Sequence, residues 1–186
     1  MKLQYDTVSS ESDILGILAL QQQNLRRNLS PEAIDSQGFV TVEHDYATMK
    51  TMNEAAPSII AKIGDEVVGY NLAMLPQFSK LIPVLVPMFD LIDSLEYGGV
   101  RLGERKYIVC GQVCVAKSQR GTGVFAGMYA YYHDTYAADF DIIITEIASS
   151  NLRSLRAHDK VGFRTVHTYT APDGLLWDIV LWDWNK

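Results

Sequence analysis

The sequence is poor in the residues that mark a disulfide-rich, metal-binding or nucleic-acid-binding protein. It has two cysteines in 186 residues, Cys110 and Cys114, and its 16 Lys and Arg are outnumbered by 22 Asp and Glu. The two cysteines lie four apart in an apparent strand, too far from each other for a disulfide, and no CxxC pair or Cys/His cluster occurs, so no metal site is expected. The net charge of −6 argues against a nucleic-acid partner that would need a broad basic surface.

Long hydrophobic runs are also missing. The most apolar stretch, "LIPVLVPMFDLI", is too short to span a bilayer and is interrupted by Pro and Asp. The amino-terminal "MKLQYDTVSSESD" is polar and lacks the apolar core of a signal peptide. We therefore expect a cytoplasmic protein without a membrane partner. Its length and its hydrophobic content of 48% predict a single domain over residues 1–186.

Strand-like and helix-like segments alternate along the chain. The first helix is expected to have Ser12 or Asp13 as its N-cap, and residues 30–45 are expected to be a loop whose middle could form a short strand. Gly111, inside the strand 107–115, suggests a β-bulge or a close approach of another backbone.

The order of the elements predicts an α+β fold with a mixed sheet flanked by helices. The expected strands lie at 2–8, 58–75 (a hairpin around "GDE"), 107–115, 141–148 and 162–184 (a hairpin around "APDG"), and the helices at 12–28, 45–56, 87–97, 124–136 and 151–160.

A glycine loop, "SQRGTGVF", joins the strand 107–115 to the next helix. Backbone N–H groups at a helix start have no intrahelical partner, and the helix dipole is positive there. Gly121 and Gly123 give the loop the freedom to converge such amides on a phosphate. The alternative is a turn that needs glycine for steric reasons only. Neither the GxxxxGK[ST] nor the GxGxxG phosphate motif is present.

A second group of polar residues follows the strand 141–148. Asn151, Ser154 and His158 have the spacing of one helix face, and Glu146 is an acidic residue in an otherwise apolar strand. Glu146 could equally be a solvated carboxylate, His158 a surface histidine, and Asn151 a helix cap.

Together the two segments "VCVAKSQRGTGV" and "NLRSLRAHDKVGF" resemble the GCN5-related N-acetyltransferases (GNAT superfamily). The shared pattern is a buried strand, [QR]-x-x-G-x-[GA], a helix, a strand and N-x-x-[SA]…K-x-G-F, over roughly residues 107–169. The resemblance implies the GNAT fold and acetyl-CoA as co-substrate. It also implies transfer of the acetyl group to a primary amine that attacks the thioester directly in a ternary complex.

The resemblance also implies roles for individual residues. Asn151, with Ser154 at the [SA] position, would contact the pantetheine arm of the cofactor. Glu146 would stand where some members carry a general base. His158 would stand where many members carry a tyrosine general acid. Residues at the strand edge would bind the pantetheine and polarise the thioester carbonyl; these are Val113, Cys114 and Val115. The amides that would cradle the pyrophosphate belong to Arg120, Gly121, Thr122, Gly123, Val124 and Phe125.

Two residues depart from the family pattern. Phe125 replaces a small residue, so the helix start must pack differently around the phosphates. His158 replaces tyrosine; an imidazolium with an ordinary pKa near 6.5 could protonate the leaving thiolate, whereas a histidine turned away from the thioester would be structural. Both departures leave room for a rival function, a non-catalytic acyl-CoA-binding module or sensor. The expected acceptor is a small-molecule amine, with a protein amino group as the alternative.

An inserted apolar segment, about residues 75–106, is too long to be an idle connection. We expect it to form a lid whose inner face walls the acceptor site and whose outer face joins a homodimer; the alternative is that it only thickens the core. Its apolar residues are Leu81, Ile82, Val84, Leu85, Met88, Phe89, Leu91, Ile92 and Leu95.

Overall fold

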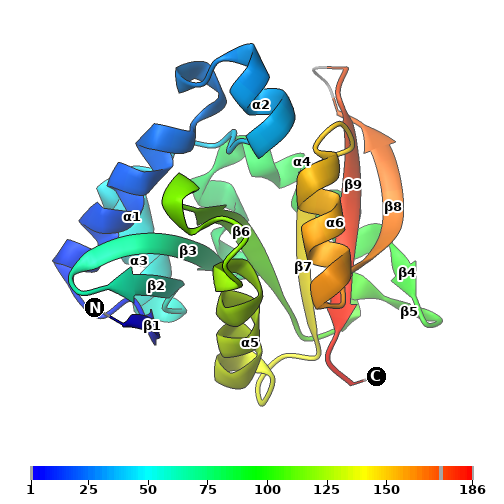
Figure 1. Ribbon diagram of the computed structural model, residues 1–186. Helices are drawn as coiled ribbons and strands as arrows, with labels where there is room; N and C mark the ends of the chain where they lie inside the picture. Colours follow the sequence, from blue (N-terminus) through cyan, green and yellow to red (C-terminus); the bar gives the residue numbers. More distant parts are fainter. Residues whose placement is uncertain (1, 172–173, 186) are drawn as a thin grey trace. The chain divides into compact units, whose positions relative to one another are not determined.

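The computed structural model describes residues 2–171 and 174–185. The chain forms two compact units, Met1–Ala73 with Cys110–Thr135 (unit 1) and Met74–Val109 with Tyr136–Lys186 (unit 2). The strands are β1 (Leu3–Thr7), β2 (Ile59–Ile63), β3 (Glu66–Met74), β4 (Glu96–Tyr97), β5 (Val100–Arg101), β6 (Tyr107–Val115), β7 (Ile142–Ala148), β8 (Arg164–Thr170) and β9 (Leu176–Asp183) (Figure 1). The helices are α1 (Glu11–Asn24), α2 (Pro31–Gln37), α3 (Tyr46–Ala55), α4 (Val86–Ser94), α5 (Val124–Tyr136) and α6 (Leu152–Val161), with short 3₁₀ turns at Arg26–Asn28, Pro76–Leu81, Pro83–Leu85, Leu102–Glu104 and Lys117–Gln119.

Seven strands form one sheet in the order β1-β2-β3-β6-β7-β9-β8, and β4 and β5 form a separate two-stranded ribbon. The pair β6–β7 is parallel, with Val109 opposite Ile144, whereas β1–β2, β2–β3, β7–β9 and β8–β9 are antiparallel. The predicted mixed sheet flanked by helices is therefore confirmed. The predicted turn at 171–174 lies in part outside the described residues.

Two local predictions near the amino terminus are wrong. Helix α1 is capped by Ser10, whose side chain accepts from the Asp13 amide while the Asp13 carboxylate accepts from the Ser10 amide. A helix start at Ser10 is more stable than one at Ser12, because the capping box satisfies two helix-end donors at once. Residues 31–37 are not a loop but helix α2, which begins with Pro31 after the cap Ser30. Proline directly after a serine is a normal helix start, because the first turn needs no proline N–H.

In unit 1, helix α5 approaches the sheet closely at two glycines. A Cβ atom at Gly127, inside α5, would lie 2.0 Å from the Tyr5 hydroxyl of β1. A Cβ atom at Gly69, on β3, would lie 3.0 Å from the Met128 sulfur. Contacts under 3 Å are not tolerated by close-packed interiors, so a larger residue at Gly127 would displace either the Tyr5 side chain or the helix.

Strand β6 changes its side-chain alternation at Gly111, which supports the predicted bulge. The Cys110 thiol donates to Asn71, whereas the Gln112 side chain accepts from the hydroxyl of Tyr70, the residue next to Asn71 on β3. Neighbouring residues on a strand point to opposite faces, and residues two apart to the same face. Cys110 and Gln112 nevertheless face opposite sides, so the alternation is interrupted between them.

In unit 2, helices cover both faces of the strands. Gly162, at the end of α6, lies so close to the Trp182 indole that a Cβ atom would be 2.8 Å from its nitrogen, and the Phe163 and Trp182 rings are 6.1 Å apart. On the opposite face, the Tyr107 hydroxyl of β6 donates to Asp93 of α4 at 2.7 Å. Figure 1 shows the same arrangement, with α6 in front of β7 and β9 and α4 behind.

The segment 75–106 packs mainly within unit 2. Leu85 and Phe89 are 6% and 3% exposed, whereas Leu81 and Val84 are 48% and 70% exposed. The buried side chains of the segment also include Ile82, Met88, Ile92 and Leu102. Much of its apolar surface is thus covered without a second molecule, and the acceptor wall and the homodimer stay predictions. No helix among the described residues is long and apolar enough to cross a membrane.

Candidate functional site

The glycine loop of unit 1 has the backbone conformation that its sequence predicts. Gly121 and Gly123 have φ angles of 82° and 93°, values that side-chain-bearing residues rarely adopt. A Cβ atom at either position would meet nothing within 4 Å beyond its chain neighbours. The glycines are therefore required by backbone conformation and not by crowding, and the space beside them is open.

The loop leads directly into α5, whose N-cap position is Gly123. Its carbonyl accepts the first helical hydrogen bond, from the Gly127 amide, at 2.9 Å. Glycine has no side chain with which to cap the helix, and the Thr122 hydroxyl is turned away to donate to the Gln119 carbonyl. First-turn amides and the positive end of a helix dipole are the features that bind phosphate groups. The residues present therefore fit the pyrophosphate of coenzyme A.

Phe125, the departure from the family pattern, packs back along its own helix. Its ring centroid lies 5.0 Å from that of Tyr129, one turn further on. This i,i+4 aromatic pair keeps the benzyl group on the helix flank, while the Phe125 amide stays part of the first turn. The large side chain thus changes the packing of α5 without altering the backbone of the glycine loop.

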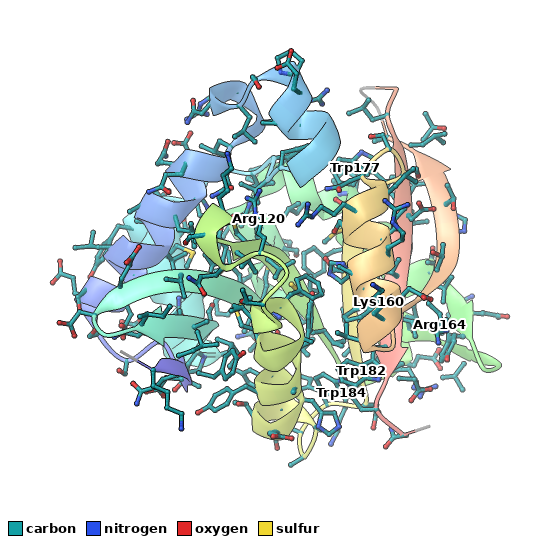
Figure 2. The ribbon with its side chains drawn as sticks, viewed as in Figure 1. Arg120, Lys160, Arg164, Trp177, Trp182 and Trp184 are labelled. Carbon is teal, nitrogen blue, oxygen red and sulfur yellow. The ribbon has the colours of Figure 1, made fainter. Side chains whose placement is uncertain are left out.

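The Arg120 side chain fastens the loop to two neighbouring elements of unit 1. Its Nε donates to the Val115 carbonyl at 3.0 Å, and its Nη2 donates to the Asn24 Oδ1 at 2.6 Å. Asn24 is buried at the end of α1, and its own amide group donates to the Leu20 carbonyl at 2.8 Å. Through these contacts Arg120, labelled in Figure 2, links β6 to α1, a role that the sequence did not predict.

The strand segment Val113–Val115 contains one buried thiol. Cys114 is 7% exposed, and burial raises the pKa of its thiol to about 12. Both cysteines are free and buried. Because only a thiolate is a good nucleophile, Cys114 is chemically inert at neutral pH. The next amide, Ala116 N–H, already donates to the Val68 carbonyl of β3.

In unit 2, the predicted row of polar residues on α6 is present as one connected series. The Asn151 side chain caps the helix by accepting from the Ser154 amide at 3.2 Å. The Ser154 carbonyl lies 2.8 Å from His158 Nδ1. Since a carbonyl oxygen only accepts hydrogen bonds, Nδ1 carries the ring proton. Asn151 is thus a helix cap, which is one of the two roles predicted for it from the sequence.

His158 differs from the expected titrating imidazole. It is 2% exposed, which excludes the surface-histidine interpretation, and its ring packs 5.0 Å from that of Phe163. Burial lowers the pKa of His158 to about 4. The residue is therefore neutral at pH 7, and an imidazolium with an ordinary pKa is not available there.

Glu146 is half-buried and interacts with a residue that the sequence analysis did not single out. The Tyr169 hydroxyl of β8 donates to Glu146 Oε2 at 2.5 Å. Glu146 pairs with Ile179, and Tyr169 pairs with Trp177, so all four side chains lie on one face of the strands. Trp182, beneath α6, pairs with Ile143 and so lies on the other face. The structure therefore joins Glu146 to Tyr169, and it places His158 on the opposite side of the sheet.

No group of three or more His, Cys, Asp or Glu side chains that could hold a metal ion occurs within the described part of the chain. No protein-family model and no curated protein matches the sequence.

Solved structures do match. One is the NatC complex bound to Gag peptide and CoA, in which a chain is 13% identical, with a TM-score of 0.66 and coverage of 98% of this chain and 99% of that one. Another is the ribosomal-protein-S18-alanine N-acetyltransferase from Escherichia coli, which is 8% identical, with a TM-score of 0.63 and coverage of 98% and 94%. A third, a Salmonella typhimurium protein solved with its cofactor acetyl-CoA, is 13% identical, with a TM-score of 0.65 and coverage of 100% and 96%.

These identities are too low to carry an activity from one protein to another, but the matches extend over nearly the whole length of each chain. Together with the strand order and the glycine loop before α5, they establish that this chain has the fold of the GCN5-related N-acetyltransferases.

Proposed function

We propose that the protein is an acetyl-CoA-dependent N-acetyltransferase that acetylates a primary amine. The observation that carries the proposal is the start of α5, where two positive-φ glycines with open space beside them lead into a helix whose positive end favours a diphosphate. The fold is shared with structures that hold CoA or acetyl-CoA, which supports the same ligand here.

The proposed reaction is direct attack of the amine on the thioester. The amine nitrogen forms the new C–N bond, the C–S bond breaks, and coenzyme A leaves as a thiolate. A covalent route through an acetyl-cysteine is disfavoured, because the Cys114 thiol stays protonated and Cys110 is 1% exposed. Holding both reactants in place supplies most of the acceleration in such a reaction.

Glu146 is the proposed general base that takes the proton from the attacking amine, directly or through water. It is a half-buried carboxylate whose orientation is fixed by the Tyr169 hydroxyl. General-base assistance contributes roughly 10²- to 10⁴-fold in rate. The amide of Val113, Cys114 or Val115 is the proposed donor to the thioester carbonyl, since the Ala116 amide is already bound to Val68.

For His158 we propose an orienting role. Its Nδ1 proton is engaged by the Ser154 carbonyl, and the neutral ring would have to take up a proton before it could give one. In this proposal His158 fixes the first turns of α6, where Asn151 and Ser154 lie, and the departing thiolate takes its proton from water. The proposed acceptor is a small-molecule amine, with a protein amino group as the alternative.

The experiment is an acceptor screen that measures release of free CoA from acetyl-CoA with small alkylamines, polyamines, aminosugars and peptides with free amino termini. Glu146→Gln should lower turnover with the best acceptor by about 100-fold or more at pH 6 and by less at pH 9, where free amine is plentiful. Absence of CoA release with every acceptor, from a folded protein that binds CoA, would contradict the proposal.

That last outcome would favour a second function, an acyl-CoA-binding module or sensor. The specific observation behind it is the neutral, buried His158 at the position where the family carries a general acid.

A further inference from the structure

Tyr169 and Glu146 meet across an intervening strand. Glu146 is on β7 and Tyr169 is on β8, and β9 lies between them in the sheet. Adjacent strands are about 4.8 Å apart, so the two backbones are separated by about 10 Å. Only a long side chain spans that distance, and the Tyr169 hydroxyl reaches Glu146 Oε2 at 2.5 Å. The register of β9 brings them to one face, with Ile179 opposite Glu146 and Trp177 opposite Tyr169.

The contact has the character of a charge-assisted hydrogen bond. An O–H group that donates to a carboxylate typically lies at 2.5–2.7 Å from it and binds about twice as strongly as it would bind a neutral acceptor. Such a bond fixes the carboxylate rotamer and favours its ionised form. It also gives the half-buried Tyr169 hydroxyl a partner.

We propose that Tyr169 is a positioning residue that holds the Glu146 carboxylate ionised and oriented to take the proton of the acceptor amine. This inference rests on the proposed function, because Glu146 needs an amine from which to take a proton. In the transfer, the amine proton passes to Glu146 as the C–N bond forms, and the Tyr169 proton stays on its oxygen throughout.

The titratable groups on the same face of the strands differ in their distance from Glu146 along the strands. His167 of β8 lies opposite Ile179, the residue that also pairs with Glu146. Asp183 of β9 lies opposite Ile142, at the other end of β7. Tyr107 of β6 lies opposite Ile142 as well, and its hydroxyl is bound to Asp93 of α4. His167 is therefore the neighbour that a test must control.

The first measurement needs no acceptor. A ¹³C NMR titration of the glutamate side-chain carboxyl carbons, with the Glu146 signal assigned by its loss in Glu146→Gln, compares wild type with Tyr169→Phe. Phenylalanine removes the hydroxyl and keeps the ring, so the proton affinity of Glu146 should rise about tenfold. The matched control, His167→Asn, should leave the Glu146 midpoint close to that of wild type. An unchanged midpoint in Tyr169→Phe would overturn the proposal.

The second measurement is the pH profile of kcat/KM with whichever of ethylamine, spermidine or a free-amino-terminal peptide releases CoA fastest. The acid limb of the profile should move to higher pH in Tyr169→Phe by the same amount as the NMR midpoint. CoA binding and KM for acetyl-CoA should stay within about twofold, because Tyr169 is not part of the glycine loop.

These outcomes distinguish failure of the positioning role from failure of the proposed function. A shifted NMR midpoint with an unshifted kinetic profile would overturn the positioning role and leave the acetyltransferase intact. No CoA release by the wild type with any amine would overturn the proposed function and, with it, this inference. A lowered melting temperature with neither midpoint changed would assign Tyr169 a purely structural role.

Discussion

Helices α5 and α6 each begin just after a strand of the sheet, yet their first turns are built differently. Helix α5 starts at a glycine, which has no side chain to cap the first-turn amides and stands in a positive-φ conformation. Helix α6 starts at Asn151, whose side chain accepts from the Ser154 amide. An uncapped start leaves N–H groups for an external anion, whereas a capped start has already satisfied one of them.

The difference shows that a helix start is a potential ligand site only when the chain itself leaves it unsatisfied. In α5 the nearby polar side chains are engaged elsewhere, with Thr122 bound to Gln119 and Arg120 bound to Val115 and Asn24. In α6 the first turn is internally connected through Asn151, Ser154 and His158. We therefore propose the start of α5 as the diphosphate site, and substitutions that make the two helix starts alike test this proposal.

The largest effect is expected from Gly123→Asp, which would give α5 a capping carboxylate. The carboxylate would compete for the first-turn amides and place a negative charge beside the diphosphate, so affinity for CoA should fall by about 1,000-fold. Isothermal titration calorimetry with CoA measures this directly.

The matched control is Gly174→Asp. Gly174 has a φ of 82° and equally open surroundings, but it lies before β9, outside the glycine loop. This control carries the same strain and charge and should bind CoA as wild type does. Equal affinities in the two folded variants would remove the glycine loop from the binding site.

The next largest effect is expected from acid, which should lower the free energy of unfolding through His158 of α6. Burial lowers the pKa of His158 to about 4, from an ordinary value of about 6.5 in the unfolded chain. The stability that comes from the neutral ring is thus complete above pH 6.5 and is lost as the pH falls from 6.5 towards 4. The loss amounts to about 3 kcal/mol. His44 of unit 1, also buried with its pKa lowered to about 4, adds a similar loss.

Urea unfolding at a series of pH values between 7.5 and 4.5 measures this slope. His158→Gln should remove the His158 share of the slope and leave the His44 share in place. A wild-type free energy of unfolding that is flat over this range would show that the two imidazoles are hydrated.

The smallest effect is expected from Asn151→Ala, which would give α6 an uncapped start. Loss of the cap should lower the free energy of unfolding by about 1 kcal/mol, and Asn151→Asp, which can still accept from the Ser154 amide, should retain most of it. Calorimetry on the same proteins asks whether Asn151 also binds the cofactor. A CoA affinity that falls more than tenfold in Asn151→Ala would show that capping is not its only role.

Much of the fold could be predicted because its signals are local. The β-rich runs around "GDE" and the apolar run "DIIITEIA" specify buried strands, and the helices α3 and α4 follow from periodicity and from Pro57 and Pro87. The start of α1 was missed because several serines compete, and only the one with an acidic residue three places on forms a capping box. Helix α2 was missed because seven residues are too few to show a period.

In the candidate site, too, features that depend on one segment could be predicted, whereas features that depend on several segments could not. The backbone of the glycine loop follows from two glycines at fixed positions, whatever the rest of the chain does. The Tyr169–Glu146 hydrogen bond depends instead on the position of β9 between β7 and β8 and on the register of β9 with each of them. Neither feature can be predicted from the sequence of a single segment. The burial of His158 depends on Phe163 beyond the helix end, so spacing on α6 could not reveal it.

The close approach of Gly127 to Tyr5 constrains how the sequence can change over time. A methyl group at position 127 would collide with the Tyr5 hydroxyl, so Gly127→Ala requires the Tyr5 side chain to turn away or position 5 to become smaller. A smaller residue at position 5 leaves a gap that alanine at 127 would then fill. Substitutions at these two sites, 122 positions apart in the chain, are therefore expected to be coupled, with the change at position 5 favoured first. Resurrected intermediates that carry the substitution at 127 first should unfold at lower temperature than either end point.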